Sequence, residues 1–427
     1  MKPNAPDQPV DAENPRVPLP RGMQFALSAA RKGRGNVSPG TVVGAAWVTR
    51  SGRCTASYHV RFGGAHAERR LLDRLKPRAG SGSLYLTLEP CTHHGKTPPC
   101  LERVIQARPI EVFVASLDPN PEVHGRGVEG LRKANIPVTV GVGALEAVAS
   151  TPGFFLLHAE KRSWVQLKVA SSLDGRIATE KGESQWITGE RARRRVHRQR
   201  SQADAVVIGA GTALADDPEL TVRHVDGPEP SKIVVDSRLR IDPDARLARV
   251  WRKSILQVEA KHGISHVTSD RTGNFWPTTR GYARMPRLIL ATVRGHGRKL
   301  EPYRAAGWEI WELPAKGNHV SLRALTSRTA KEGLLHLFVE GGPGLAGGLL
   351  GDRLVDELSV YLAPKILGGS RTWSGHYSAS SLRSAREFER AAVESLGDDI
   401  LWTSHRKGVL TELAKCSQDW SKNLASS

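Results

Sequence analysis

The sequence of 427 residues predicts an α/β fold divided into two domains. A single core stops growing at roughly 250–300 residues, so a chain of this length is expected to divide. Strand-like runs rich in Val, Ile and Leu alternate with helical patterns in both halves, which is typical of sheets covered by helices. Two motifs mark separate halves, a His- and Cys-containing one from His66 to Cys100 and a glycine-rich one from Glu340 to Gly348.

Composition excludes several classes of protein. Hydrophobic residues make up 39% and charged residues 25% of the chain, as in a soluble globular protein. No apolar run approaches the roughly 18 residues that a membrane-spanning helix requires. Residues 1–20 are polar and lack a signal core, so we expect a disordered leader. Four cysteines are too few for a disulfide framework, and we expect a reducing, cytoplasmic setting.

The net charge of +19 favours anionic partners such as phosphorylated metabolites, nucleotide cofactors or nucleic acid. Basic residues are densest between Arg191 and Arg200, where few aromatic side chains are available to stack on bases. A general bias toward arginine would explain the surplus equally well, so the charge does not choose among these partners.

The first domain is expected over residues 21–148 and the second over 160–410, with a linker at about 143–162. In the first domain we expect a helix from Met23, a hairpin over 41–60, helices starting at His66 and Cys100, and strands over 83–88, 111–116 and 137–142. In the second we expect strands over 164–170, 205–208, 232–235, 287–290, 309–312 and 336–339, and a helix over 190–200, in a mostly parallel sheet. Residues 251–285 are a probable insertion, and 411–427 a flexible tail.

A metal site is predicted by His66, Cys91 and Cys100, because one imidazole and two thiols are ligands that zinc prefers. Three ligands leave a fourth position for water, as in catalytic zinc sites, and zinc lowers the pKa of that water to roughly 7. Glu68 lies where it can move protons without occupying the metal, and H-x-E…P-C…C is the arrangement of zinc nucleobase deaminases. The alternative is that the cysteines are buried apolar fillers beside an ordinary helix start.

A glycine-rich segment from Glu340 to Gly348 follows an apolar run and opens a helix, which suits a pyrophosphate. It matches G-x-G-x-x-G from Gly342 to Gly347, but it comes late in its domain, and Asp356 is too near to be the acidic residue of a Rossmann fold. We therefore expect a nucleotide site on a different kind of sheet. The alternative is a plain strand-to-helix turn.

Residues 23–142 resemble the deaminase half of the bifunctional riboflavin-biosynthesis deaminase–reductases. The resemblance is carried by Ala30–Gly35, His66–Glu68, the long Pro90–Cys100 cysteine motif, Asp118–Pro121, Gly125 and Gly127. It implies a cytidine-deaminase-like zinc domain in which Glu68 transfers protons. The zinc ligands it implies are His66, Cys91 and Cys100, and the substrate contacts are His59 and Lys96. Without the resemblance, His59 reads equally well as a solvated strand residue and Lys96 as a solvated loop charge.

Residues 164–369 resemble the reductase half of the same family, a dihydrofolate-reductase-like domain that uses NADPH. This resemblance includes Val355–Leu358 and Ala363–Gly369. The NADPH contacts that it implies are Ala170, Trp186, Thr212, Asp216, Ser237, Gly342, Pro343, Gly344, Leu345, Ala346, Gly347 and Gly348. The substrate contacts that it implies are Lys168, Ser184, Arg200, Leu220, Arg223 and Glu340. Arg200 and Arg223 suit a phosphate group, which arginine binds bidentately, although both could be solvated surface charges.

One departure from the family concerns the deaminase half. Gly40-Thr41 stands where the family has Asn-Pro, so an amide expected to contact the substrate is missing. Arg61, which stands where the family prefers Lys, is a candidate replacement donor. Glycine also frees the loop backbone at this position.

Together, the two halves imply deamination of 2,5-diamino-6-(5-phosphoribosylamino)pyrimidin-4(3H)-one by zinc-held hydroxide. NADPH-dependent reduction of the ribosyl group to ribityl would follow, giving 5-amino-6-(5-phosphoribitylamino)uracil. We expect a homo-oligomer with no nucleic-acid or membrane partner. Two alternatives remain, namely a monofunctional reductase with a degenerate deaminase half and a zinc deaminase that acts on nucleic acid. The second alternative predicts strongly salt-dependent polynucleotide binding.

Overall fold

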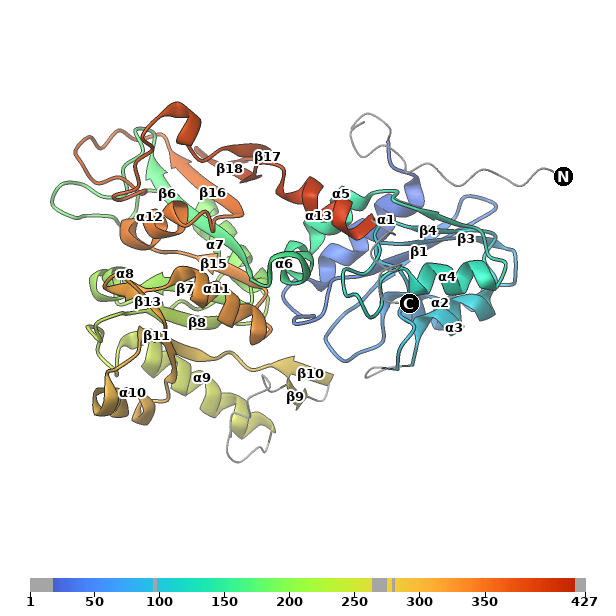
Figure 1. Ribbon diagram of the computed structural model, residues 1–427, viewed down its shortest axis with the longest axis horizontal. Coiled ribbons are helices and arrows are strands. Elements are labelled where there is room, and N and C mark those ends of the chain that lie inside the picture. The colour runs from blue at the N-terminus through green and yellow to red at the C-terminus, as the bar shows by residue number, and fades with distance from the viewer. Residues whose placement is uncertain (1–17, 95–97, 263–274, 279–280, 419–427) are drawn as a thin grey trace. The chain divides into compact units, whose positions relative to one another are not determined.

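The computed structural model describes residues 18–94, 98–262, 275–278 and 281–418. The chain divides after Glu160 into two compact units (Figure 1). The N-terminal unit consists of residues 1–160 with 279–283 and 410–427, and the C-terminal unit holds 161–278 and 284–409. The α/β class and the division into two domains are therefore as the sequence predicted.

The N-terminal unit is built on a five-stranded sheet of order β2-β1-β3-β4-β5. Its elements are α1 (Arg21–Ala30), β1 (Gly44–Thr49), β2 (Cys54–Tyr58), α2 (Ala67–Leu75), β3 (Gly82–Leu86), α3 (Cys100–Ala107), β4 (Val112–Val114), α4 (Arg126–Lys133), β5 (Val138–Val140), α5 (Ala144–Ser150) and α6 (Pro152–Glu160), joined by α13 (Val409–Gln418). β1 is antiparallel to β2 and β3, whereas β3, β4 and β5 are parallel. Ala46, Tyr85 and Phe113 cluster with apolar residues of α1 and α5. Alternate strand residues such as Trp47 and Leu84 are also buried, so both sheet faces are covered.

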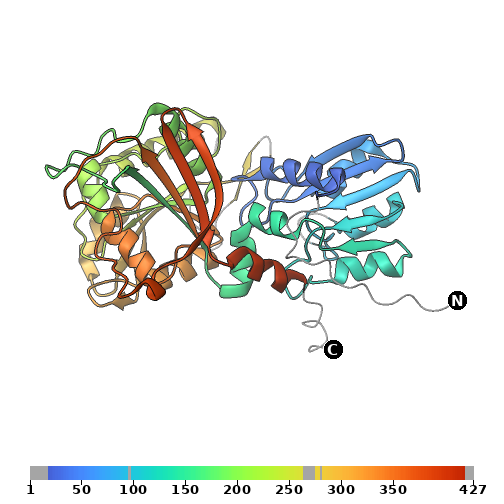
Figure 2. The same cartoon turned by 90° about the horizontal axis from the view of Figure 1, so that it is seen from above.

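Two segments of this unit differ from the prediction. The expected linker at 143–162 is mostly helical, because α5 and α6 occupy it. The expected flexible tail begins instead with α13, in which Leu413, Ala414 and Ser417 are buried. Ser116, in the loop after β4, donates a 2.9 Å hydrogen bond to the Ser417 hydroxyl. Figure 2 shows α13 beside the helices that follow β5. Residues 419–427 lie outside the described part of the chain, as do 1–17 of the expected leader.

The C-terminal unit is built on a nine-stranded sheet of order β12-β11-β8-β7-β15-β6-β16-β18-β17. Its strands are β6 (Trp164–Ser172), β7 (Ala205–Gly209), β8 (Ser231–Val235), β11 (Leu288–Val293), β12 (Glu309–Leu313), β15 (His336–Val339), β16 (Glu357–Ala363), β17 (Phe388–Leu396) and β18 (Asp399–Arg406). Its helices are α7 (Glu190–Gln202), α8 (Ala210–Asp216), α9 (Arg246–His262), α10 (Glu301–Ala305), α11 (Leu322–Lys331) and α12 (Pro343–Gly351). Every pairing from β12 to β16 is parallel, whereas β18 is antiparallel to both of its neighbours, β16 and β17.

Both faces of this sheet are covered, as expected for parallel strands. Apolar residues of α11 and α12 pack on one cluster of strand side chains. Those of α7, α8, α9 and α10 pack on a second cluster. The expected insertion at 251–285 starts within α9 and contains the short strands β9 (Phe275–Thr278) and β10 (Gly281–Arg284), which pair with each other. Residues 263–274 and 279–280 lie outside the described part.

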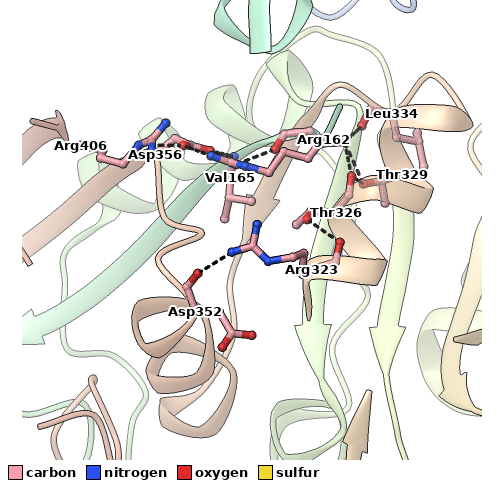
Figure 3. Close-up of polar contacts among 10 residues, drawn as sticks. Arg162, Val165, Arg323, Thr326, Thr329, Leu334, Asp352, Asp356 and Arg406 are labelled. Atoms are coloured by element: carbon pink, nitrogen blue, oxygen red, sulfur yellow. Dashed lines mark hydrogen bonds and ion pairs between the residues drawn. The ribbon is translucent and has the colours of Figure 1, made fainter. Parts of the chain in front are cut away.

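A buried ion pair fixes the start of the large sheet (Figure 3). The Arg162 guanidinium donates to both oxygens of Asp356 at 2.6 and 2.7 Å, and the two side chains are 3% and 0% exposed. Asp356 also accepts the Val165 amide at 3.0 Å, and Arg406 lies 3.5 Å away. One carboxylate thus joins residues at the start of β6, the start of β16 and the end of β18. A buried charge of this kind is tolerated because it is paired and hydrogen-bonded.

Candidate active sites

Three predicted metal ligands converge in the N-terminal unit. His66 is the N-cap residue of α2, Cys100 is the first residue of α3, and Cys91 lies in the loop after β3. Their ligand atoms all lie within 4.8 Å of one another. Each thiol sulfur is 3.5 Å from His66 Nδ1, and the Cys100 amide donates to Cys91 Sγ at 3.3 Å.

This cluster fits a zinc ion in donor chemistry. Two sulfurs and an imidazole nitrogen are the ligands of zinc rather than of magnesium or calcium. Hydrogen bonds from Cys100 and His66 outweigh burial and lower the pKa of Cys91, which favours the thiolate form of this sulfur. Metal binding requires a deprotonated thiol. Both helices begin at the cluster, and the positive end of a helix favours a thiolate.

Glu68 and His59 both present unpartnered polar atoms beside the cluster. The Glu68 side chain is buried, and its Oε2 has no hydrogen-bond partner among the described residues. Burial raises the pKa of Glu68 to about 7, although His66 acts in the opposite direction. The His59 ring lies 5.1 Å from the His66 ring, and its Nε2 also lacks a partner in the described structure. Burial and the neighbouring His66 lower the pKa of His59 to about 4, so its imidazole is neutral.

The segment that departs from the family lies next to His59. The Thr41 carbonyl is 3.5 Å from His59 Nδ1, and the buried Thr41 hydroxyl has no partner among the described residues. A Cβ atom added to Gly40 would lie 2.9 Å from the Val37 carbonyl oxygen, so a side chain there requires the loop to shift. This close approach is a structural reason for glycine at position 40. Lys96, the other expected substrate contact, lies outside the described residues.

In the C-terminal unit, Lys168, Arg200 and Glu340 form a second charged cluster. Arg200 on α7 donates to Glu340 through Nε at 2.5 Å and through Nη2 at 3.1 Å, and its Nη1 donates to the Thr221 carbonyl at 2.9 Å. Lys168 on β6 lies 4.0 Å from the same carboxylate. Burial lowers the pKa of Lys168, against the influence of Glu340. Burial alone would raise the pKa of Glu340, but Arg200 and Lys168 hold it below its usual value.

The glycine-rich segment lies at the carboxyl end of β15, next to the turn after β7. These two strands are parallel neighbours, so their following turns meet at one edge of the sheet. The Gly342 amide donates to the Thr212 hydroxyl on α8 at 2.9 Å, which joins the two turns. A Cβ atom added to Gly344 would meet nothing within 4 Å, so the start of α12 is open. This edge fits a phosphate-bearing cofactor such as NADPH.

The remaining predicted residues are less closely grouped. Arg223 is exposed and pairs with Glu219 at 2.5 Å. Both arginines expected to bind phosphate, Arg200 and Arg223, are therefore bound to a carboxylate in the structure. Leu220 is buried with a positive φ of 53°, and strained backbone of this kind is often found at functional sites. Trp186 is 64% exposed and lies under the Arg193 guanidinium at 4.6 Å. Other predicted positions are Ala170 on β6, Ser184 before α7, Asp216 at the end of α8, and Ser237, which accepts the Val320 amide.

Two buried polar residues near these sites were not predicted. Glu89 precedes the Pro90-Cys91 pair and accepts backbone amides, while His197 on α7 accepts the Arg223 amide through Nδ1 at 2.9 Å. A charged residue at the end of a buried strand was the available signal for Glu89. No local signal marked His197, which lies inside the arginine-rich block.

No helix in the described part of the chain is long and apolar enough to cross a membrane.

Comparison with known proteins places both sites in a family context. A family model for the cytidine and deoxycytidylate deaminase zinc-binding region matches residues 19–116, and one for the RibD C-terminal domain matches residues 163–402. Fold and sites together define an enzyme that joins a zinc-dependent deaminase to an NADPH-dependent reductase.

Similarity to individual proteins extends over nearly the whole chain. The riboflavin biosynthesis protein RibD of Actinobacillus pleuropneumoniae is 34% identical over 381 residues, which is 89% of this chain and 93% of the relative. RibD of Escherichia coli K12 is 34% identical over 395 residues, covering 88% and 96%. The solved structure of Acinetobacter baumannii RibD, form 1, has a TM-score of 0.73 at 27% identity, covering 90% of this chain and 97% of that chain.

A solved Thermotoga maritima protein, titled a diaminohydroxyphosphoribosylaminopyrimidine deaminase/5-amino-6-(5-phosphoribosylamino)uracil reductase, has a TM-score of 0.71 at 28% identity and covers 90% and 97%. The chain belongs to the RibD family of bifunctional deaminase–reductases in riboflavin biosynthesis. The family expected from the sequence motifs is thereby confirmed.

Proposed function

We propose that the N-terminal unit deaminates 2,5-diamino-6-(5-phosphoribosylamino)pyrimidin-4(3H)-one, and that the C-terminal unit then reduces the product's ribosyl group to ribityl with NADPH. The observation that carries the first half is the convergence of three ligand atoms within 4.8 Å beside a buried carboxylate. The name of the similar Thermotoga maritima protein, a deaminase and reductase of these pyrimidine phosphates, supports the substrate for both halves.

His66, Cys91 and Cys100 would hold the zinc ion, which when bound would supply an acidic water and stabilise developing negative charge. Glu68 is the residue that transfers protons during deamination. Its unpartnered Oε2 takes a proton from the attacking water and delivers it to the amino group that leaves as ammonia. A carboxyl with a pKa near 7 suits both steps at neutral pH.

His59 would bind the substrate through Nε2, which is buried and lacks a partner in the described structure. Leaving such an atom unpaired costs about 1–3 kcal/mol, so a substrate acceptor or donor that meets it gains that amount back. We also propose Lys96 as a substrate contact, and this assignment rests on the resemblance to the family alone. The intact ligand cluster argues against a degenerate deaminase half.

In the C-terminal unit we place the NADPH site at the turns after β7 and β15, which the Thr212–Gly342 bond joins, and assign further NADPH contacts by family resemblance. The proposed NADPH residues are Ala170, Trp186, Thr212, Asp216, Ser237 and Gly342 to Gly348. The proposed substrate residues are Lys168, Ser184, Arg200, Leu220, Arg223 and Glu340. NADPH supplies the hydride, and the protein orients the sugar beside it. Because the Arg200 donors are bound to Glu340 and Thr221, its proposed role includes holding Glu340 in place.

Variants that separate the two activities test this proposal. Cys91→Ser and Cys100→Ser should lose zinc and ammonia release, and NADPH oxidation with the deaminated substrate should persist. Arg200→Ala should weaken substrate binding more than NADPH binding, because Arg200 and its partner Glu340 are both proposed substrate residues. Full zinc retention in both cysteine variants would refute the ligand assignment, and a weaker affinity for NADPH alone would move Arg200 to the cofactor site.

We also propose that the protein is a homo-oligomer that works in the cytoplasm. Val393, Ile400 and Trp402 are 50%, 43% and 41% exposed on one face of the β17–β18 hairpin, where Val393 is directly opposite Trp402. Grouped exposed apolar residues are typical of interfaces. Light scattering should show an oligomer that Trp402→Glu weakens, and a monomeric wild type would refute this assignment.

A further inference from the structure

Glu89 is a buried carboxylate whose partners are backbone amides. Its side chain is 3% exposed. Oε1 accepts the amides of Asp118 at 2.8 Å and Gly125 at 2.7 Å, and Oε2 accepts those of Gly127 at 2.9 Å and Val128 at 3.4 Å. Glutamate is almost never fully buried unless such partners are present. These bonds join the loop that follows β3 to residues 118–128.

The same loop carries the metal ligand Cys91. The Glu89 amide donates to the Ser116 carbonyl at 3.0 Å, so both the backbone and the side chain of this residue are held. Pro90 follows, and its ring restricts the backbone conformation directly before Cys91. Gly127 of α4 lies close to this proline, because a Cβ atom added to Gly127 would lie 2.2 Å from the Pro90 carbonyl oxygen. The segment before Cys91 therefore packs directly against the backbone at the start of α4.

We propose that Glu89 is a positioning residue of the deaminase site, which holds Cys91 in place for the metal. This inference rests on the proposed zinc deaminase function. It extends that function to a residue that touches neither metal nor substrate. Partners that orient metal ligands indirectly are needed for affinity, and changing one costs roughly 10- to 100-fold in metal binding.

Glutamine is a stringent replacement because it has nearly the same shape. Its single acceptor oxygen can serve only one of the two pairs of amides. The NH₂ group would face the other pair, donor against donor, and would push the loop away from residues 118–128. Glu129→Gln is the matched control, because Glu129 on α4 is exposed and pairs only at the surface with Lys133.

The experiment uses the full-length protein loaded with Co²⁺, whose absorption reports thiolate ligation. Wild type and Glu129→Gln should show the same sulfur-to-cobalt band and the same affinity. Glu89→Gln should shift or weaken that band and bind Co²⁺ roughly 10- to 100-fold less tightly. NADPH oxidation by the C-terminal unit serves as the internal control for intact protein and should not change.

A second variant covers the case in which Glu89→Gln does not fold. Gly127→Ala displaces the Pro90 carbonyl while leaving the carboxylate in the chain, and it should alter the cobalt band in the same direction. Unchanged bands and affinity in the folded variants would overturn the positioning role. A wild type that binds Co²⁺ without a thiolate band would instead overturn the proposed zinc function, so the two failures are distinguishable.

Discussion

Asp356→Ala should destabilise the C-terminal unit severely. The change removes the buried carboxylate that accepts two bonds from the 3%-exposed Arg162 and one from the Val165 amide (Figure 3). Breaking a buried pair in this way costs about 3–5 kcal/mol. For a domain of about 150–250 residues, 1 kcal/mol shifts Tm by roughly 2–4 °C, so we expect a fall of about 6–20 °C.

Differential scanning calorimetry of the full-length protein measures this shift, with Asp352→Ala as the control. Asp352 lies on the same segment, but its carboxylate pairs with the exposed Lys316, and such surface pairs contribute about 0–1 kcal/mol. NADPH oxidation should be lost at a lower temperature in the Asp356 variant, and ammonia release should not. Equal Tm values for the two variants would refute the reasoning.

Further predictions concern chemistry and pH. Glu68→Gln should keep zinc yet lose roughly 10²–10⁴-fold in ammonia release, and unchanged turnover would remove Glu68 from the mechanism. Gly40→Asn with Thr41→Pro restores the family's residues and requires the loop to move away from the Val37 carbonyl. We expect deaminase turnover to rise several-fold without an effect on the reductase, since one hydrogen bond is worth about 1–3 kcal/mol in a buried site. An unchanged deaminase turnover in this double variant would contradict the idea that the wild type lacks a substrate contact at position 40. Burial, then nearby arginines, lower the pKa of His197 to about 4, and its Nδ1 must stay unprotonated to accept the Arg223 amide. Because the unfolded state binds this proton more readily, stability of the C-terminal unit should fall from pH 6.5 toward 4. His197→Asn should flatten that decline, and an unchanged profile would exclude His197.

The two-unit α/β fold and the metal cluster could be predicted from the sequence. Strand and helix periodicity is a local property, and the ligand types and order of His66, Cys91 and Cys100 encode their chemistry directly. The strands β6, β7, β8, β11, β12 and β15 were predicted for the same reason. The strands β16, β17 and β18 were not predicted, and in β17 the exposed residues hide the apolar alternation typical of a strand.

Long-range contacts account for what the sequence did not predict. Helix α13 is short, and its buried face is explained only by packing in the N-terminal unit, as the Ser116–Ser417 bond illustrates. The amide partners of Glu89 are distant in the sequence and carry no side-chain signature. Pairing of Arg200 with Glu340 likewise depends on the meeting of α7 and β15, so an arginine predicted to bind phosphate is held by a carboxylate.

One chain is expected to carry out two successive reactions. The most direct measurement gives the zinc-loaded, full-length protein the diaminopyrimidine phosphate under anaerobic conditions, first without NADPH and then with it. We predict release of about one ammonia per substrate before NADPH is added, followed by oxidation of about one NADPH per deaminated molecule. NADPH oxidation with supplied deaminated substrate, but no ammonia from the zinc-loaded protein under any condition, would contradict the account and leave a monofunctional reductase.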